Sequence, residues 1–203
     1  NGNVMYDEQE KIFKMWYVIW LPGEDGVNNV GGFGYAVSKD GVNWSKPAIN
    51  DDGTSAVMVP KAKGVVAITV FKDLVETDPQ RRYKLFYAEK PDGTDRTLST
   101  SVGYSPDGFR FTAEAENPVI TYSDRQTNCY WDPARKRYVA YLRFGPPNQR
   151  IISRTESEDF VHWSPKVTVL NYTKMDDTKT YGWTDLYGMR IMPYDGVYIG
   201  FVT

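Results

Sequence analysis

Residues 70–87, VFKDLVETDPQRRYKLFY, lead from an apolar strand through an acidic, proline-containing turn into a second strand that begins with an aromatic residue. Alternating apolar residues on both sides of an Asp, Pro or Gly turn predict a β-hairpin. The same order of features returns in three other segments, 4–17 (VMYDEQEKIFKMWY), 130–141 (YWDPARKRYVAY) and 192–201 (MPYDGVYIGF). One hairpin pattern therefore recurs along the chain.

A second element alternates with the hairpin: a strand leads into a Ser-x-Asp turn that closes on an aromatic residue. Its copies are 38–44 (SKDGVNW), 105–111 (SPDGFRF) and 157–163 (SEDFVHW). Asp bonds nearby backbone groups and Gly tolerates positive φ, so both suit the turn, and the aromatic residue can pack between sheets. Both elements share an interval of roughly 50 to 70 residues, which holds about four strands.

This repeat predicts the fold class. Sustained helical periodicity is missing, which disfavours a βαβ fold. Four-stranded units repeated radially predict an all-β fold, a β-propeller, in which closure protects the strand edges, and the chain accounts for about three and a half blades. Its first and last residues already belong to strands, so we expect residues 1–203 to form a single partial propeller domain, truncated at both ends.

Composition narrows the choice of partners and cofactors. Of 203 residues, 41% are hydrophobic and 15% aromatic, enough for a substantial core. The 24 basic and 26 acidic residues give a formal charge of −2, and no window gathers the positive charge that a nucleic acid would need. No apolar run approaches the length of a membrane span. Cys129 is expected to be a buried thiol. The single histidine, His162, lies in an outer turn, so we expect no metal and no cofactor.

Segments 14–17, 34–44 and 78–84 resemble phrases of the five-bladed β-propeller superfamily that includes the β-fructosidases, arabinanases and xylosidases, and the chain looks like bacterial members of it. The resemblance covers nearly the whole chain and concerns architecture, because these phrases lie between strands. It implies five blades in the full protein. It also implies a glycoside hydrolase-like activity on an oligosaccharide or polysaccharide in the central channel, and an extracytoplasmic location, periplasmic or secreted.

The turn at 38–44 is also similar to the Asp-box of sialidases, whose propellers have six blades, so a sialidase-like enzyme stays an alternative. Sialidases hold the substrate carboxylate with three arginines, whose planar fork suits two parallel hydrogen bonds. The arginines available for such a clamp are Arg125, Arg143, Arg150, Arg154 and Arg190.

Cleavage of a glycosidic bond needs two carboxyl groups about 5 to 10 Å apart. In the families that the chain resembles, these acids lie near the start of the innermost strands and face the channel. Asp124 and Asp185 both precede an inner strand, in consecutive blades, so we predict them as the catalytic pair; alternatively, each only caps a loop. Acids in the hairpin and outer turns are expected to do structural work: Asp7, Asp73, Asp78, Asp132, Asp195, Asp40, Asp107 and Asp159.

Aromatic and polar residues near the two aspartates are predicted to bind the substrate: Arg125, Asn128, Trp183, Tyr187 and Arg190. Tryptophans that recur with the repeat are instead expected to pack between blades: Trp16, Trp44, Trp131 and Trp163. Two functions stay open. One is a glycoside hydrolase that uses Asp124 and Asp185 as acid/base or substrate-binding carboxylates. The other is a propeller that binds glycans without cleaving them, or serves as an interaction scaffold.

Overall fold

The computed structural model describes residues 2–22, 29–57, 64–90, 98–125, 127–144, 150–171 and 186–203, with only the backbone for 20–22 and 29–31. These residues form three four-stranded antiparallel sheets and one β-hairpin, which we call blades 1 to 4. Among the described residues, the helical structure is limited to the 3-10 turn η1 (Pro79–Arg81). The predicted all-β fold is therefore confirmed.

Each blade begins with its innermost strand and runs outward in sequence order. Blade 1 contains β1 (Gly2–Asp7), β2 (Ile12–Pro22), β3 (Asn29–Ser38) and β4 (Ala56–Val57). Blade 2 contains β5 (Ala67–Lys72), β6 (Tyr83–Glu89), β7 (Ser99–Ser105) and β8 (Thr112–Ala113). Blade 3 contains β9 (Thr127–Asp132), β10 (Arg137–Arg143), β11 (Ile152–Ser157) and β12 (Val167–Leu170). Blade 4 is the hairpin of β13 (Met189–Tyr194) and β14 (Val197–Val202).

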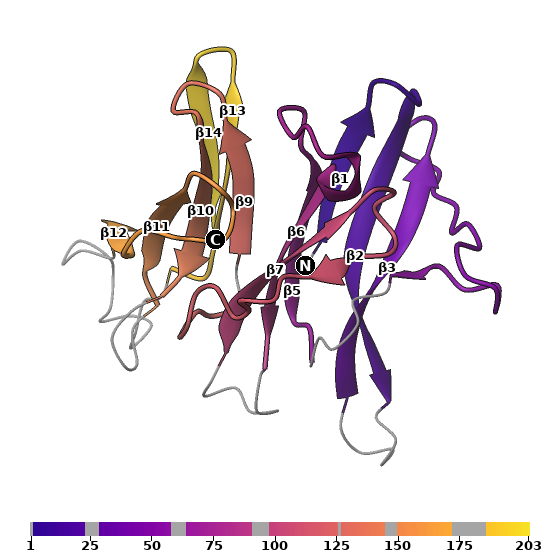
Figure 1. Cartoon of the computed structure of the whole chain (residues 1–203), viewed down its shortest axis with the longest axis horizontal. Helices are drawn as coiled ribbons and strands as arrows, with labels where there is room; N and C mark the ends of the chain where they lie inside the picture. Colours follow the sequence, from indigo (N-terminus) through magenta and orange to yellow (C-terminus); the bar gives the residue numbers. More distant parts are fainter. Residues whose placement is uncertain are drawn as a thin grey trace, which may run out of the picture.

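The innermost strands of successive blades lie next to one another. Strand β5 contacts both β1 and β9, and β9 also contacts β13. In Figure 1 the blades accordingly stand side by side, from blade 1 on the right to blades 3 and 4 on the left. This is the arrangement of a β-propeller, in which sheets pack face to face around a shared centre.

The acids in the hairpin turns of blades 1 to 3 do the structural work predicted for them. At the end of β1, Oδ1 of Asp7 accepts hydrogen bonds from the Gln9 and Glu10 amides at 3.0 and 3.2 Å. Asp132 accepts from two turn amides in the same way at the end of β9. These bonds satisfy backbone donors that the tight turn leaves without a ladder partner.

The outer turns of blades 1 to 3 share one hydrogen-bond pattern. In blade 1 the Ser38 hydroxyl bonds Asp40 at 2.9 Å, and Oδ1 of Asp40 accepts from the backbone N–H groups two and three residues later. Blades 2 and 3 repeat these bonds around Asp107 and Asp159. The recurring Ser-x-Asp pattern thus fixes the same turn in each blade.

The core lies between the blades. Trp16, fully buried, reaches from blade 1 to the outer turn of blade 2, where its indole N–H donates to the Gly108 carbonyl at 2.8 Å. Gly108 has a φ of +83°, and a Cβ there would come within 3.1 Å of the Trp16 ring. At the same turn position in blade 3, Phe160 adopts a φ of 72° and its own buried ring fills the space against Phe86.

Two further tryptophans follow the predicted packing role, since Trp131 and Trp163 pack against the cluster between blades 2 and 3. Trp44 is only partly buried, and its indole N–H donates to the Gly41 carbonyl of its own turn. Cys129 is buried in the same cluster between blades 2 and 3, as predicted.

Candidate functional site

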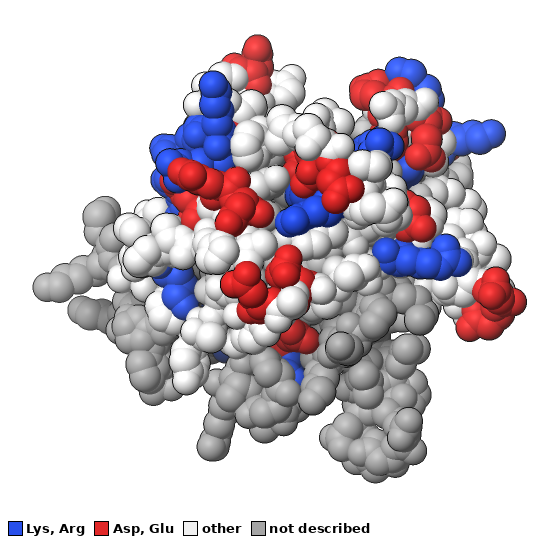
Figure 2. All heavy atoms as spheres, in the orientation of Figure 1, with Lys and Arg blue, Asp and Glu red and all other residues white. Residues whose placement is uncertain are grey.

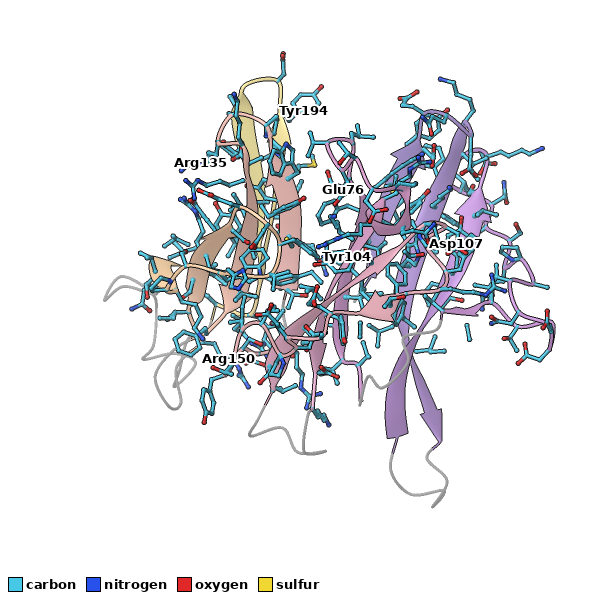
Figure 3. The ribbon with its side chains drawn as sticks, viewed as in Figure 1. Glu76, Tyr104, Asp107, Arg135, Arg150 and Tyr194 are labelled. Atoms are coloured by element: carbon cyan, nitrogen blue, oxygen red, sulfur yellow. The ribbon has the colours of Figure 1, made fainter. Side chains whose placement is uncertain are left out.

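We call one end of the blades the mouth: the end where β5, β9 and β13 begin and β6 and β10 finish. Figure 3 shows Arg150 at this end, whereas Arg135 and Tyr194 lie at the opposite end. Antiparallel pairing brings the last residues of each second strand beside the first residues of the innermost strand, as with Leu142 and Thr127 in blade 3. Side chains from several blades therefore meet at the mouth.

Asp124 lies at the mouth, in the segment that leads into β9. Its carboxylate forms a bidentate ion pair with Arg143, the last residue of β10, through Nε–Oδ2 and Nη2–Oδ1 contacts of 2.7 Å each. The Asp124 N–H also donates to the Arg143 carbonyl at 3.2 Å. Two parallel charge-assisted bonds fix both position and orientation, so Asp124 is held rigidly.

The ion pair also controls the charge of Asp124. Burial alone would raise the pKa of this carboxyl, but the hydrogen bonds and positive charge of Arg143 outweigh burial and lower it below its ordinary value. The Arg143 side chain is 4% exposed and that of Asp124 is 34% exposed. Asp124 is therefore an ionised carboxylate that solvent, or a ligand, can still reach.

Tyr187 completes the cluster from blade 4. Its ring centroid lies 4.3 Å from the Arg143 guanidinium carbon and 5.7 Å from that of Arg150, and its carbonyl accepts from Arg143 Nη1 at 3.3 Å. Backbone bonds fix this segment, because the Tyr187 N–H donates to the Thr203 carbonyl at 2.7 Å. Tyr187 is nevertheless 48% exposed, so part of the residue can contact a ligand at the mouth.

The other predicted binding residues are placed as follows. Arg125 follows Asp124 directly, is partly buried, and its backbone N–H donates to Asp124 Oδ1 at 2.6 Å. Arg190 is partly buried on β13. Asn128 has a structural contact, because its Oδ1 accepts the Ile191 N–H at 2.8 Å and so joins blade 3 to blade 4.

Asp185 and Trp183 lie outside the described residues, so the predicted pairing of Asp124 with Asp185 stays a prediction. Among the arginines considered for a sialidase-like clamp, Arg143 forms an ion pair with Asp124, and Arg154 forms one with Glu156. Three-arginine recognition thus stays a prediction as well.

Glu89 is a carboxyl at the mouth that sequence reasoning missed. It ends β6, is 8% exposed and accepts a hydrogen bond from the Ser101 hydroxyl. Ser99 stands opposite Glu89 in the β6–β7 register, and the Ser123 N–H donates to the neighbouring Leu98 carbonyl at 2.9 Å. Glu89 and Asp124 therefore approach the same edge of blade 2. The available signal was an acid at the end of a strand that is apolar or aromatic apart from Lys84.

Metal ions, membranes and surface charge were the other features considered in the sequence. Among the described residues, no group of His, Cys, Asp and Glu side chains could hold a metal ion. The described residues also include no helix long and apolar enough to cross a membrane. On the face in Figure 2, acidic and basic side chains are interspersed.

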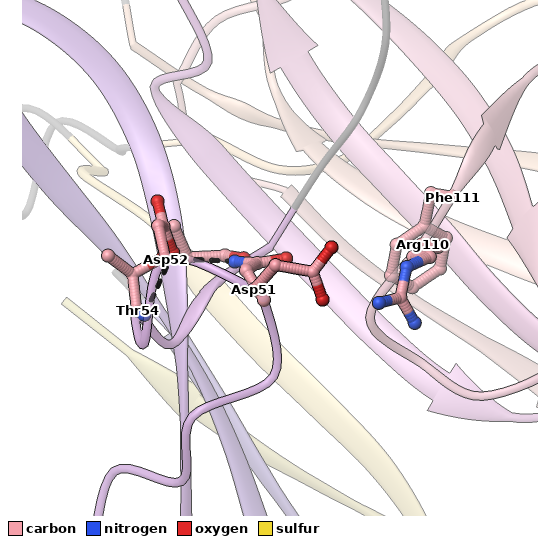
Figure 4. A pocket seen from close by; sticks show the side chains of 7 residues that line it. Asp51, Asp52, Thr54, Arg110 and Phe111 are labelled. Atoms are coloured by element: carbon pink, nitrogen blue, oxygen red, sulfur yellow. Dashed lines mark hydrogen bonds between the residues drawn. The ribbon is translucent and has the colours of Figure 1, made fainter.

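A separate cavity of about 470 Å³ lies at the outer edge of blades 1 and 2, between the β3–β4 connection and the outer turn of blade 2 (Figure 4). Asp52 accepts the Thr54 N–H at 2.9 Å, and Arg110 donates to the Ile49 carbonyl at 3.2 Å. These polar groups thus hold their own turn and join blade 2 to blade 1, and the cavity lies apart from the mouth.

Comparison with known proteins agrees with the architecture. No protein-family model and no curated protein sequence matches the chain. Among solved structures, it is similar to a fructofuranosidase from Schwanniomyces occidentalis in complex with fructose, at 18% identity and a TM-score of 0.61 over 84% of this chain and 33% of that one. It is also similar to a GH32 β-fructofuranosidase from Bombyx mori, at 15% identity and a TM-score of 0.65 over 95% and 39%.

A third similar structure is an N-acetylgalactosamine deacetylase from F. plautii in complex with blood group B trisaccharide, at 16% identity and a TM-score of 0.64 over 96% of this chain and 59% of that one. The chain thus spans between a third and three fifths of these proteins. At such identities the similarity concerns the fold, which the chain shares with propeller domains of glycosidases.

Proposed function

We propose that the chain is part of a longer glycoside hydrolase-like propeller that acts on an oligosaccharide at the mouth, with Asp124 and Asp185 as acid/base or substrate-binding carboxylates. The observation that carries this proposal is the Asp124–Arg143 ion pair beside the exposed Tyr187 ring. Sugar sites combine an apolar ring face with a few rigidly held polar groups. Membership of a bacterial branch and an extracytoplasmic location belong to the same proposal and rest on the sequence resemblance.

The ionised state of Asp124 limits its chemical role. A carboxylate whose pKa is lowered can attack the sugar, activate water or accept a hydroxyl hydrogen bond, but it cannot be the proton donor near neutral pH. The general acid must then be a second carboxyl about 5 to 10 Å away. Asp185 is the candidate from sequence, and Glu89 is the candidate from its position at the same edge of blade 2.

The test is hydrolysis of a panel of aryl glycosides and of fructo-, arabino- and xylo-oligosaccharides by the full-length protein that contains this chain. Asp124→Asn should reduce turnover by roughly 100-fold or more, because it removes the charge of the group that acts on the sugar. Asp159→Asn, in an outer turn, is the control and should retain activity. Asp185→Asn and Glu89→Gln are then compared, and the variant that loses turnover identifies the general acid. Full turnover in Asp124→Asn would contradict the proposal.

A propeller that binds a glycan without cleaving it is the second candidate. Both carboxylate oxygens of Asp124 are already bonded to Arg143, which favours a positioning role over direct attack. Under this alternative the wild-type protein shows no turnover on the panel, while calorimetry detects a glycan whose binding Asp124→Asn weakens.

A further inference from the structure

One cation at the mouth has no counter-charge among the described residues, and it points to the kind of sugar. Four arginines lie on segments that meet there: Arg125, Arg143, Arg150 and Arg190. The carboxyls that the structure describes at the same edge are Asp124 and Glu89. Arg143 and Asp124 neutralise each other through their bidentate contact.

Arg190 differs from Arg143, because no ion pair or side-chain hydrogen bond joins it to any described residue. It is partly buried, and burial is the cause that lowers its pKa. A guanidinium taken from water without a counter-charge costs free energy, and its pKa is too high for it to release the proton. Such a cation is most stable when an anion binds beside it.

The position of Arg190 is also fixed. It is the second residue of β13 and pairs with Phe201 of β14. The next residue, Ile191, is held by Asn128 of blade 3, and Tyr187, three residues earlier, contacts Arg143. Arg190 thus stands on a rigid strand beside the site already described, where a partly exposed tyrosine and an ionised carboxylate lie.

We infer that the oligosaccharide bound at the mouth carries a carboxylate, and that Arg190 is the residue that binds this group. The inference rests on the proposed function and names its substrate class. A planar guanidinium donates two parallel hydrogen bonds to the two oxygens of a carboxylate and also neutralises its charge. A neutral sugar offers neither the paired oxygens nor the negative charge. Tyr187 provides the apolar face for the sugar ring, and Asp124 accepts from its hydroxyls.

The experiment is titration calorimetry of the full-length protein with matched probes. Trigalacturonate is compared with its methyl ester, which has the same rings without the charge, and sialyllactose is compared with lactose. At least one acid should bind ten times or more tightly than its neutral partner, and added salt should reduce this difference.

Variants assign the effect to Arg190. Arg190→Gln should lose tenfold or more in affinity for the acid and little for the neutral partner, whereas Arg190→Lys, which keeps the charge, should retain part of the preference. Arg137→Gln, at the opposite end of β10, is the matched control and should bind normally. Thermal unfolding followed by circular dichroism verifies that each variant folds.

The outcomes separate the two proposals. If neutral oligosaccharides bind or are cleaved and the acids gain nothing, the carboxylate inference is overturned while the proposed function stands. Preference for a sulfated oligosaccharide alone also overturns the carboxylate assignment. If no glycan binds or reacts, the proposed function fails and the inference fails with it.

Discussion

The phenol of Tyr138 in blade 3 donates a 2.6 Å hydrogen bond to Oδ2 of Asp73 in blade 2, and both side chains are at most 6% exposed. Tyr138 lies near the start of the second strand of its blade, and Asp73 directly follows the innermost strand of the preceding blade. One side-chain bond therefore joins two neighbouring sheets at the end opposite the mouth.

The same contact recurs at the other blade boundaries. Tyr83 donates to Asp7 at 3.3 Å between blades 2 and 1, and Tyr198 donates to Asp132 at 2.7 Å between blades 4 and 3. Phe13 holds the equivalent position in blade 1 and has no hydroxyl. The aspartates that end the inner strands thus have two tasks, since they bond their own turn and the next blade.

Tyr138→Phe should lower the free energy of unfolding by about 1 to 3 kcal/mol, because it leaves a buried carboxylate without its hydroxyl donor. Urea unfolding measures the change. Tyr194→Phe, on a side chain that is 62% exposed, is the control and should shift stability by less than about 0.5 kcal/mol. Equal effects of the two substitutions would show that the inter-blade bond does not stabilise the protein.

Asp7 predicts a pH dependence of stability. Burial would raise the pKa of Asp7, but its bonds to Lys14 and Lys72 outweigh burial and hold it well below the ordinary value of 3.8. Because the folded pKa is the lower one, the stabilisation is present above pH 3.8 and is lost as the pH falls further.

Asp7→Asn should therefore destabilise the protein at pH 7 by about 3 to 5 kcal/mol, since Lys14 and Lys72 lose a buried counter-charge. The gap between wild type and variant should narrow below pH 4. Urea midpoints at pH 7, 5 and 3 test this, with Asp51→Asn, on an exposed side chain, as the control. A gap that is constant across this range would refute the linkage.

The fold was predictable because its signals are local. The Ser-x-Asp turns work through bonds over two or three residues, as from Asp40 to the Val42 and Asn43 amides, so their residue types appear at fixed spacing. The hairpin turns follow the same rule at Asp7. Repetition of these local patterns was enough to identify four-stranded blades.

The site was less predictable, because its contacts join distant residues. Asp124 was identified from its place before an inner strand, but its partner Arg143 is 19 residues away at the end of another strand. Asn128 was expected to bind sugar, and its bond to Ile191, 63 residues away, follows only from the packing of blades 3 and 4. The spacing of residues in the sequence does not show which blade edges pack together.

Asn128 can serve both purposes, and one substitution separates them. Asn128→Asp keeps the oxygen that accepts the Ile191 N–H, so stability should change by less than about 0.5 kcal/mol, while any sugar contact of the amide nitrogen is lost. Asn3→Asp is the matched control at the same position of blade 1. There the amide nitrogen donates to the Val70 carbonyl, so this variant should lose about 1 to 3 kcal/mol. Unchanged glycan binding in a stable Asn128→Asp variant would limit Asn128 to its structural contact.

Arg143 should set the pH range in which Asp124 is charged. Without the guanidinium, burial still raises the pKa of Asp124, and only the Arg125 N–H and the Arg150 charge still lower it, so the pKa should rise from its value in the wild type. Arg143→Gln should therefore move the acid limb of glycan binding or hydrolysis upward by roughly 1 to 3 pH units, the usual effect of a neighbouring arginine on an aspartate.

The measurement is a pH profile from 3 to 8, with Arg143→Lys included to test whether charge alone restores the limb. Lys supplies a point charge without the planar fork. Arg143→Lys should therefore bring the acid limb back toward that of wild type, while its affinity for the glycan recovers less. Arg137→Gln, at the other end of β10, should leave the profile unchanged. If the acid limb of Arg143→Gln coincides with that of wild type, Asp124 is not the group whose ionisation the site depends on, and the role proposed for the ion pair is wrong.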